Sequence, residues 1–231
     1  MPAQLKILSA GAVKPGLTKV MDAFRRDNPS DLKVTFATAP AILEQVNAGG
    51  EAVDMVVAPQ NVLDQLAKTG KIPAAGRVTL GRIGVGVMVR EDASLPGIAD
   101  VDAFRDSLLN AESIVYNQAS TGIYLETLFD RLGIYAEVRA KSTRYPDFAA
   151  VLDHVSKGKG REIGLGATTV IIENEKVGVK FVGPLPEQIQ NYTAYVAGAT
   201  ADSEAGGLAQ QFIRYLSSPA ARSLLSGAGI Q

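Results

Sequence analysis

The sequence predicts an α/β protein with mixed, largely parallel sheets. Short apolar runs that are typical of strands alternate with segments of helical periodicity along the whole chain. Pro15, Pro40 and Pro219 stand where a first helical residue is expected, and Gly49 and Gly70 stand where helices should end. This alternation is typical of layered α/β structure in which most strands run parallel.

Eight strands are expected from the apolar runs. They cover residues 5–10, 32–37, 53–58, 83–90, 113–116, 163–166, 179–182 and 192–197. Two of the intervening segments carry apolar residues at the i, i+3, i+4, i+7 spacing of a buried helix face. These residues are Leu17, Val20, Met21 and Phe24, and Phe148, Val151, Leu152 and Val155.

Five loops that lead from a strand into a helix contain small or hydroxyl-bearing residues. They cover residues 9–15, 37–40, 117–122, 144–147 and 166–169. A helix N-terminus has unpaired N–H groups and about half a positive charge, so it attracts anions. In open α/β sheets, ligands bind beyond the carboxyl ends of the strands. The pattern therefore predicts that these loops hold a small anion.

Composition excludes several classes of function. The 23 basic and 24 acidic residues nearly balance and no basic stretch stands out, so we expect neither a nucleic-acid partner nor an electrostatic membrane anchor. No apolar run is long enough for membrane insertion. The absence of cysteine excludes thiolate metal sites and a cysteine nucleophile, and no other metal-ligand spacing or cofactor motif occurs. A single histidine without a Gly-x-Ser-x-Gly elbow disfavours hydrolase chemistry.

The N-terminus has neither a basic segment nor an apolar core of the kind found in signal peptides. Two locations stay open. The protein is cytoplasmic if Met1 is native, and periplasmic if a signal peptide was removed.

Two connections divide the chain into two lobes. The glycine-rich strand near residue 83 and the Pro184-Leu185-Pro186 segment before the strand near Tyr192 are the expected crossings, and the last helices return to the first lobe. We expect residues 1–81 and 197–231 in lobe I and residues 82–196 in lobe II. We also expect the protein to be a monomer.

An ordered set of segments resembles the periplasmic molybdate-binding proteins, the type II solute-binding proteins of ABC importers. The segments are residues 8–12, 36–39, 44–49, 52–58, 120–124 and 212–221, and the similarity covers nearly the whole chain. It implies a two-lobed type II periplasmic-binding-protein fold with two crossing strands as a hinge. It also implies that a small anionic ligand binds in the cleft between the lobes, with an ABC permease as a possible partner.

In molybdate binders, serine hydroxyls, backbone amides and a tyrosine hold the oxyanion, and the resemblance places these groups at Ala12, Ala39, Thr121, Phe148 and Ala167. Alanine removes three side-chain donors, at about 1.5–3 kcal/mol each. A micromolar dissociation constant corresponds to about 8 kcal/mol. A molybdate or tungstate ligand therefore becomes the less favoured alternative.

Cations near the loops favour a larger anion. Lys14 lies beside the first loop and Arg144 precedes the fourth helix, and arginine grips a carboxylate through two parallel hydrogen bonds. The leading expectation is an organic di- or tricarboxylate. The expected ligand-binding residues are Gly11, Ala12, Val13, Lys14, Thr38, Ala39, Tyr116, Ser120, Thr121, Gly122, Arg144, Tyr145, Phe148, Ala167 and Thr168.

One branch with this resemblance is enzymatic. Aconitate isomerases resemble the molybdate-binding proteins and move a proton across a three-carbon unit of a tricarboxylate. A base would remove the proton, and N–H groups and cations would stabilise the resulting anion. Lys14, Tyr116, Tyr145 and Asp147 are candidate bases, and the sequence does not rank them.

Simpler roles stay open for the same residues. Asp147 could stabilise a helix N-terminus, and Arg144 could pair with Asp147 or Glu126. Lys14 could be a solvated residue before a helix. His154 is expected on a solvated helix surface rather than at the site.

Overall fold

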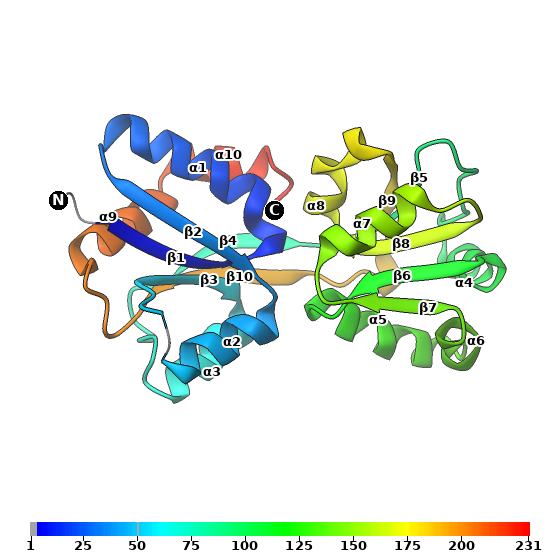
Figure 1. Cartoon of the computed structure of the whole chain (residues 1–231), viewed down its shortest axis with the longest axis horizontal. Coiled ribbons are helices and arrows are strands. Elements are labelled where there is room, and N and C mark those ends of the chain that lie inside the picture. Colours follow the sequence, from blue (N-terminus) through cyan, green and yellow to red (C-terminus); the bar gives the residue numbers. More distant parts are fainter. Residues whose placement is uncertain (1–3, 50) are drawn as a thin grey trace. The chain divides into compact units, whose positions relative to one another are not determined.

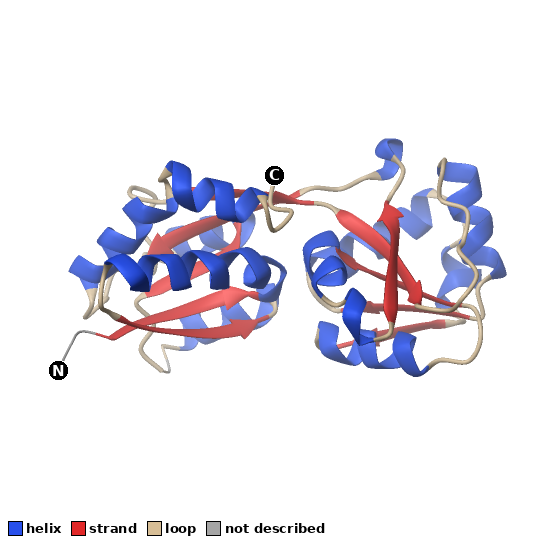
Figure 2. Ribbon diagram, turned by 90° about the horizontal axis from the view of Figure 1, so that it is seen from above, coloured by secondary structure: helices blue, strands red, loops and turns tan. Residues whose placement is uncertain are grey.

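The computed structural model describes residues 4–49 and 51–231, and the chain divides into two compact units (Figure 1). Unit 1 comprises Met1–Ile83 and Thr193–Gln231, and unit 2 comprises Gly84–Tyr192. Each unit has one five-stranded sheet as a middle layer with helices on both faces (Figure 2). The predicted two-lobed α/β fold with mixed, largely parallel sheets is confirmed.

The sheet of unit 1 has the strand order β2-β1-β3-β10-β4. Strands β2, β1 and β3 are parallel, and β10 runs antiparallel to both β3 and β4. The bounds are β1 (Gln4–Ala10), β2 (Asp31–Ala37), β3 (Met55–Pro59), β4 (Val78–Ile83) and β10 (Thr193–Ala199).

Helices cover both faces of this sheet. Helices α2 and α3 pack on one face, and α1, α9 and α10 pack on the other (Figure 1). The bounds are α1 (Lys14–Asp27), α2 (Ala39–Ala48), α3 (Gln60–Lys68), α9 (Gly206–Leu216) and α10 (Pro219–Ser226), and the short 3-10 helix η1 (Gly11–Val13) precedes α1.

The amphipathic pattern of α1 determines how it packs. Its four periodic apolar residues, from Leu17 to Phe24, are all buried. The Phe24 ring meets Phe212 edge-on at 5.0 Å between centroids and Tyr215 at 5.2 Å, which joins α1 to α9. Such aromatic pairs stabilise a fold by about 0.5–1.5 kcal/mol beyond the burial of their area.

The sheet of unit 2 repeats the arrangement, with the order β7-β6-β8-β5-β9. Strands β7, β6 and β8 are parallel, and β5 runs antiparallel to β8 and β9. The bounds are β5 (Val85–Arg90), β6 (Ser113–Asn117), β7 (Ser142–Tyr145), β8 (Glu162–Ala167) and β9 (Val179–Pro184).

Two apolar cores lie on the two faces of this sheet. Ile114 and Tyr116 point into the core beneath α4, α5 and α6, whereas Val115 points into the core beneath α7 and α8. Alternate residues of a strand face opposite sides, so each strand contributes to both cores. The bounds are α4 (Val101–Asn110), α5 (Ser120–Arg131), α6 (Tyr135–Arg139), α7 (Phe148–Lys157) and α8 (Thr168–Glu173), with 3-10 turns η2 (Glu175–Val177) and η3 (Glu187–Ile189).

Two strands were not predicted. The strand expected at residues 83–90 is interrupted at Gly84, which separates β4 from β5, so β4 lies almost entirely outside that range. Strand β7 has the sequence Ser-Thr-Arg-Tyr and no apolar run, yet it pairs in parallel with β6 along its whole length. Its pairing partner, and not its hydrophobicity, makes it a strand.

The unit boundaries fall at 83/84 and 192/193, whereas the sequence suggested 81/82 and 196/197. Strand β10 explains the second difference, because it pairs with β4 from Thr193 onward.

Gln190 ties the two connecting segments together within unit 2. Its side-chain oxygen accepts the Val85 N–H at 2.8 Å, and its side-chain nitrogen donates to the Val85 carbonyl at 3.0 Å. This amide therefore bonds to Val85 as a neighbouring strand would. Gly84, next to Val85, accepts the N–H of Thr168 at 3.0 Å, which links the same segment to the start of α8.

Asp54 is a buried polar anchor of unit 1, with 5% of its surface exposed. Its carboxylate accepts the N–H of Lys6 at 2.9 Å, the N–H of Ala205 at 3.1 Å and the Ser203 hydroxyl at 2.9 Å. Burial by itself raises the pKa of Asp54, but these hydrogen bonds outweigh it, so the pKa lies below its ordinary value.

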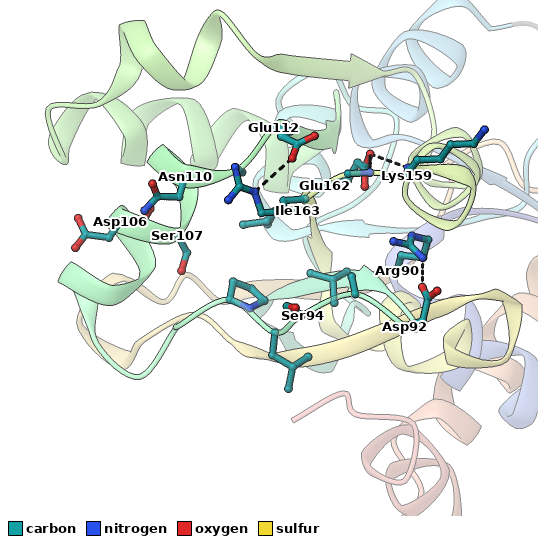
Figure 3. Close-up of a pocket in the computed structure, with 17 residues that line it drawn as sticks. Arg90, Asp92, Ser94, Asp106, Ser107, Asn110, Glu112, Lys159, Glu162 and Ile163 are labelled. Carbon is teal, nitrogen blue, oxygen red and sulfur yellow. Dashed lines mark hydrogen bonds and ion pairs between the residues drawn. The ribbon is translucent and has the colours of Figure 1, made fainter.

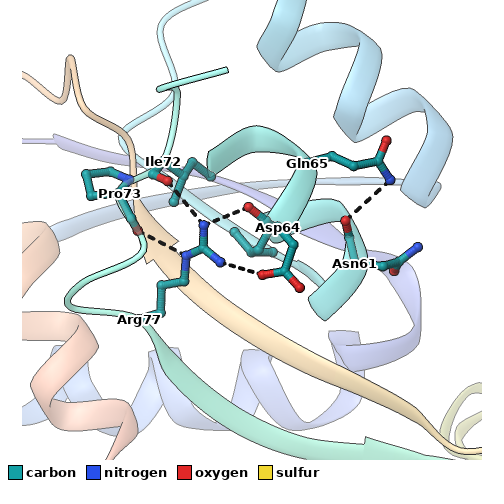
Figure 4. A network of polar contacts seen from close by, with 7 residues as sticks. Asn61, Asp64, Gln65, Ile72, Pro73 and Arg77 are labelled. Atoms are coloured by element: carbon teal, nitrogen blue, oxygen red, sulfur yellow. Dashed lines mark hydrogen bonds and ion pairs between the residues drawn. The ribbon is translucent and has the colours of Figure 1, made fainter. Parts of the chain in front are cut away.

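Arg77 is a second polar anchor, and the segment after α3 wraps around its guanidinium (Figure 4). It donates to the carbonyls of Pro73, Leu63 and Ile72 and to the Asp64 carboxylate at 2.9 Å. The Asp64 side chain is 52% exposed, so its ion pair with Arg77 is solvent-screened.

No helix within residues 4–49 and 51–231 is long and apolar enough to cross a membrane.

We expect Asp54→Asn to lower the free energy of unfolding by about 1–3 kcal/mol at neutral pH, because an amide NH₂ group would face buried N–H donors. The lowered pKa of Asp54 sets the pH dependence. The stabilisation that the ionised Asp54 carboxylate provides is complete above the ordinary aspartate pKa of about 3.9. It is lost as the pH falls through the lower pKa that Asp54 has in the folded protein. The difference in the free energy of unfolding between wild type and Asp54→Asn should therefore become smaller in acid. Urea unfolding from pH 7 to pH 3 measures this difference.

Asp64→Asn is the matched control. Arg77 keeps its three carbonyl acceptors in this variant, so we expect a change of about 0.5 kcal/mol or less. Equal losses in the two variants would contradict the anchoring role of Asp54.

Candidate functional site

The predicted loops of unit 1 lie side by side at one edge of its sheet. Strands β1 and β2 pair in parallel register up to Ala10 and Ala37, so both chains leave the sheet at the same level. The first continues into η1 and α1, and the second continues through Thr38 into α2. The backbone N–H groups of two helix starts therefore meet at this edge.

Neither of these helix starts is capped by its own side chain. The residues at the cap positions of α1 and α2, Val13 and Thr38, make no capping side-chain hydrogen bond, and neither first turn holds an acidic residue. Asp100, Asp147 and Ser218 cap α4, α7 and α10, whereas α3 and α9 also lack a side-chain cap and an acidic residue in the first turn. Helix N-termini without a side-chain cap or a nearby carboxylate favour anions through their dipole and their remaining N–H groups.

The side chains of the predicted residues in unit 1 differ in exposure. Val13 and Ala39 are buried, so these two positions offer backbone groups alone. Gly11, Ala12 and Thr38 are half-buried. Lys14 is exposed, and its ammonium lies over the Phe36 ring, 5.8 Å from the centroid.

Unit 2 has the same arrangement at the carboxyl ends of β6, β7 and β8. Asn117 of β6 lies opposite Tyr145 of β7, and α5, α7 and α8 begin just beyond the three strand ends. Helix α5 has no side-chain cap and no acidic residue in its first turn, which carries Ser120 and Thr121. Helix α8 also lacks a side-chain cap and an acidic residue in its first turn. Phe148 starts α7, and Ala167 ends β8 just before Thr168.

Gly122 lets α5 start directly against the end of β6. A Cβ atom at this position would lie 1.8 Å from the carbonyl oxygen of Asn117, far inside contact distance. No side chain larger than hydrogen fits unless the helix start moves. Gly122 was predicted as a ligand-binding residue, and the structure adds a packing requirement at the same position, next to Ser120 and Thr121.

Tyr116 was predicted at the site, and the structure corrects this. It is 3% exposed and its ring packs edge-on against Phe129 at 5.9 Å in the core beneath α5. Burial raises the pKa of its hydroxyl, with the negative charge of Glu126 adding to the effect. The strand alternation that buries Ile114 also turns Tyr116 inward, so its side chain is neither a ligand contact nor a base at the loop edge.

Arg144 has the simpler of its two predicted roles. Its guanidinium pairs with Glu126 of α5 at 2.9 Å and lies over the Tyr116 ring, 5.9 Å from the centroid. The pairing of Tyr116 with Arg144 between β6 and β7 puts both side chains on the α5 face of the sheet. The ion pair with Glu126 matches the alternative role predicted for Arg144, and a contact of this arginine with a ligand carboxylate stays a prediction.

Asp147 and Tyr145 are engaged as well. Asp147 caps α7 by accepting the Ala150 N–H at 2.9 Å, which is its alternative role. The Tyr145 hydroxyl lies 3.0 Å from Nδ1 of His154, whose Nε2 lies 3.4 Å from the Ser113 hydroxyl. His154 is thus half-buried and hydrogen-bonded instead of solvated. Of the four candidate bases, Lys14 alone has a functional group free of such contacts in the described part of the chain.

A cavity of about 510 Å³ lies at the opposite edge of the unit 2 sheet, where β6 and β8 begin (Figure 3). Most of its charged groups are paired, although the buried Arg90 Nε and Glu162 Oε2 atoms have no hydrogen-bond partner among the described residues. Arg90 pairs with Asp92, Arg161 pairs with Glu112, and Glu162 accepts N–H groups of the turn before it. It is remote from the helix starts that could bind an anion. The described residues hold no group of three or more histidines or acids placed to bind a metal.

One contact at the site was not predicted. Phe36 was part of the segment that carried the family resemblance, but its position under the Lys14 ammonium follows from the β1–β2 register, which the sequence does not reveal.

We expect Gly122→Ala to lower the free energy of unfolding by about 1–3 kcal/mol, because the added methyl group overlaps the Asn117 carbonyl. Gly11→Ala is the matched control from the other unit. A Cβ there meets no atom within 4 Å and the backbone φ is not positive, so stability should be equal or slightly higher. Thermal and urea unfolding would measure both, and an undisturbed Gly122→Ala protein would contradict the close approach.

The chain is similar to known proteins over nearly its whole length. The chain is 27% identical over 236 residues to aconitate isomerase from Pseudomonas sp., which covers 98% of this chain and 87% of the relative. It is 22% identical over 231 residues to the molybdate-binding protein ModA of Escherichia coli K12, with 98% and 88% covered. The solved structure of the Azotobacter vinelandii periplasmic molybdate-binding protein matches with a TM-score of 0.81 at 16% identity, covering 98% of both chains.

A family model described as bacterial extracellular solute-binding protein matches residues 5–231. The predicted resemblance to molybdate-binding solute-binding proteins and to aconitate isomerases is thereby confirmed. The chain belongs to the bacterial extracellular solute-binding protein family.

Proposed function

We propose that this protein binds a small organic polycarboxylate through the loops at the carboxyl ends of the parallel strands in its two units. The observation that carries the proposal is the set of uncapped helix starts without acidic residues in their first turns, at α1 and α2 in unit 1 and at α5 in unit 2. Backbone N–H groups and helix dipoles bind carboxylates as well as inorganic oxyanions.

The side chains favour a carboxylate over molybdate. Molybdate-binding proteins have side-chain donors at positions that match Ala12, Ala39 and Ala167 of this sequence. An alanine side chain donates no hydrogen bond. A tetrahedral oxyanion would lose about half or more of the free energy behind micromolar binding. A larger ligand can reach other donors, such as the Thr38 and Ser120 hydroxyls and the Lys14 ammonium.

The positive charge for such a ligand would come mainly from unit 1. Arg144 is paired with Glu126, whereas Lys14 has no acidic partner among the described residues. A ligand with two or three carboxylates would therefore rely on backbone N–H groups, hydroxyls and one ammonium group. These groups together would balance only part of the negative charge of the ligand.

Family membership suggests a role in uptake. A solute-binding protein of this family would act outside the cytoplasm and deliver its ligand to an ABC permease after hinge closure around the crossing segments. The protein would act as a monomer in that role.

A ligand screen by thermal unfolding tests the proposal. Propane-1,2,3-tricarboxylate, citrate, aconitate, succinate, molybdate, tungstate and sulfate are compared at equal ionic strength. A ligand at 100 times its dissociation constant stabilises the folded state by about 2.7 kcal/mol, which raises the midpoint by about 5–10 °C. We expect the largest rise with tricarboxylates. A rise with molybdate or tungstate alone would overturn the proposal.

A second candidate function is isomerisation of an unsaturated tricarboxylate. The specific observation in its favour is the aconitate isomerase, which is 27% identical over nearly the whole chain. In a 1,3-proton shift, a base removes a proton from the carbon next to the double bond, and the proton returns at the other end of the three-carbon unit. The uncapped N–H groups would stabilise the delocalised anion formed between these steps. Lys14 is the candidate base that has no hydrogen bond or ion pair among the described residues, and it would have to act in its deprotonated form.

Incubation of the protein with cis-aconitate in deuterated buffer separates the two functions. An isomerase gives trans-aconitate with deuterium at the exchanged carbon, as followed by proton NMR. A binding protein raises its own unfolding midpoint with aconitate but leaves the vinyl signal of the ligand unchanged. Stabilisation without exchange or product would eliminate the enzymatic function.

A further inference from the structure

We propose that Lys14 determines the preference of the site for ligands with three carboxylates over ligands with two. This inference rests on the proposed polycarboxylate-binding function and assigns the selection by ligand charge to one side chain of unit 1.

The position of Lys14 is unfavourable for the helix that it begins. It is the first residue of α1 and follows the 3-10 turn η1, which its own N–H closes on the Gly11 carbonyl, so it lies within one turn of the positive end of the helix dipole. An acidic residue would stabilise this helix start, and a lysine destabilises it. No acidic residue in the first turn compensates for the charge. A cation placed against local stability in this way suggests a role in binding.

Phe36 holds the ammonium at the loop edge. The Lys14 Nζ atom lies over the half-buried Phe36 ring at 5.8 Å from its centroid. Phe36 belongs to β2, and the next two residues lead into α2. The cation therefore lies where the α1 and α2 starts come together. A cation–π contact orients an ammonium group without neutralising its charge.

No carboxylate competes for Lys14 in the described part of the chain. The ion pairs of unit 1 join other cations to acids, such as Lys33 to Glu51 and Arg77 to Asp64. In unit 2 the cation nearest the predicted loops, Arg144, is occupied by Glu126. The full charge of Lys14 thus remains available to a ligand.

Backbone N–H groups and a lysine respond differently to ligand charge. Each N–H group carries a partial charge and binds one lone pair, whereas an ammonium group carries a full positive charge. A third carboxylate without a counter-charge would repel the other two at short range. Lys14 supplies that counter-charge, so its effect should be largest for the ligand with the highest charge.

Calorimetric titration with a matched pair of ligands tests this role. Propane-1,2,3-tricarboxylate and glutarate share the same carbon chain between their terminal carboxylates and differ by the central carboxylate. They are titrated at one ionic strength and at neutral pH into wild type, Lys14→Met, Lys14→Arg and Lys19→Met. Lys19 is an exposed lysine of the same helix, so its variant has the same net charge as Lys14→Met.

We expect Lys14→Met to weaken tricarboxylate binding at least tenfold and glutarate binding threefold or less. Lys14→Arg should restore most of the preference, and Lys19→Met should change both affinities by less than twofold. The thermal midpoint of Lys14→Met should equal or exceed that of wild type, because the repulsion with the helix dipole is removed.

Equal losses for both ligands, or no loss in Lys14→Met, would overturn this inference while leaving polycarboxylate binding intact. Failure of wild type to bind either ligand would instead contradict the proposed function itself.

Discussion

Three parallel strands that end in register determine the rest of each unit. In unit 1, β2, β1 and β3 end at one edge, and in unit 2, β7, β6 and β8 do the same. A parallel strand must be followed by a crossover, here a helix, so several helices begin at the same edge. Their unpaired N–H groups collect there because of backbone geometry and independently of the side chains.

This arrangement requires that the helix starts be held by something other than caps. Uncapped helices lose the stabilisation of about 1 kcal/mol that a serine or aspartate cap provides. In unit 1, the buried face of α1 and its Phe24–Phe212 contact fix the helix instead. In unit 2, Gly122 lets α5 pack directly on the Asn117 carbonyl. Packing therefore supplies the rigidity of these helix starts in place of side-chain caps.

Polar anchors away from this edge complete both units. Asp54 joins the start of β3 to the segment before α9, and Gln190 joins the two segments that enter unit 2. Each anchor has its buried hydrogen-bonding groups matched, which a buried polar side chain needs in order to stabilise a fold. The loop edges differ, because Lys14 has an aromatic contact but no acidic partner among the described residues. The buried polar anchors and the polar residues at the loop edges are thus separate sets of residues.

The sequence by itself determined the alternation of strands and helices, the buried face of α1 and the five loops at the strand ends. These features depend on local periodicity and on proline, glycine and cap residues, which act over a few positions. The two connecting segments suggested two lobes, and the family resemblance added the type II solute-binding arrangement.

The tertiary structure alone decided what the polar side chains do. Arg144 meets Glu126, and Tyr145 meets His154, because the β6–β7 pairing and the packing of α5 and α7 bring these residues together. Tyr116 faces inward because alternate residues of β6 point to the core beneath α5. No local sequence pattern reveals which face of the strand that core covers. A sequence states which groups are available, whereas their partners depend on contacts between distant segments, and those contacts determine which side chains stay free for a ligand.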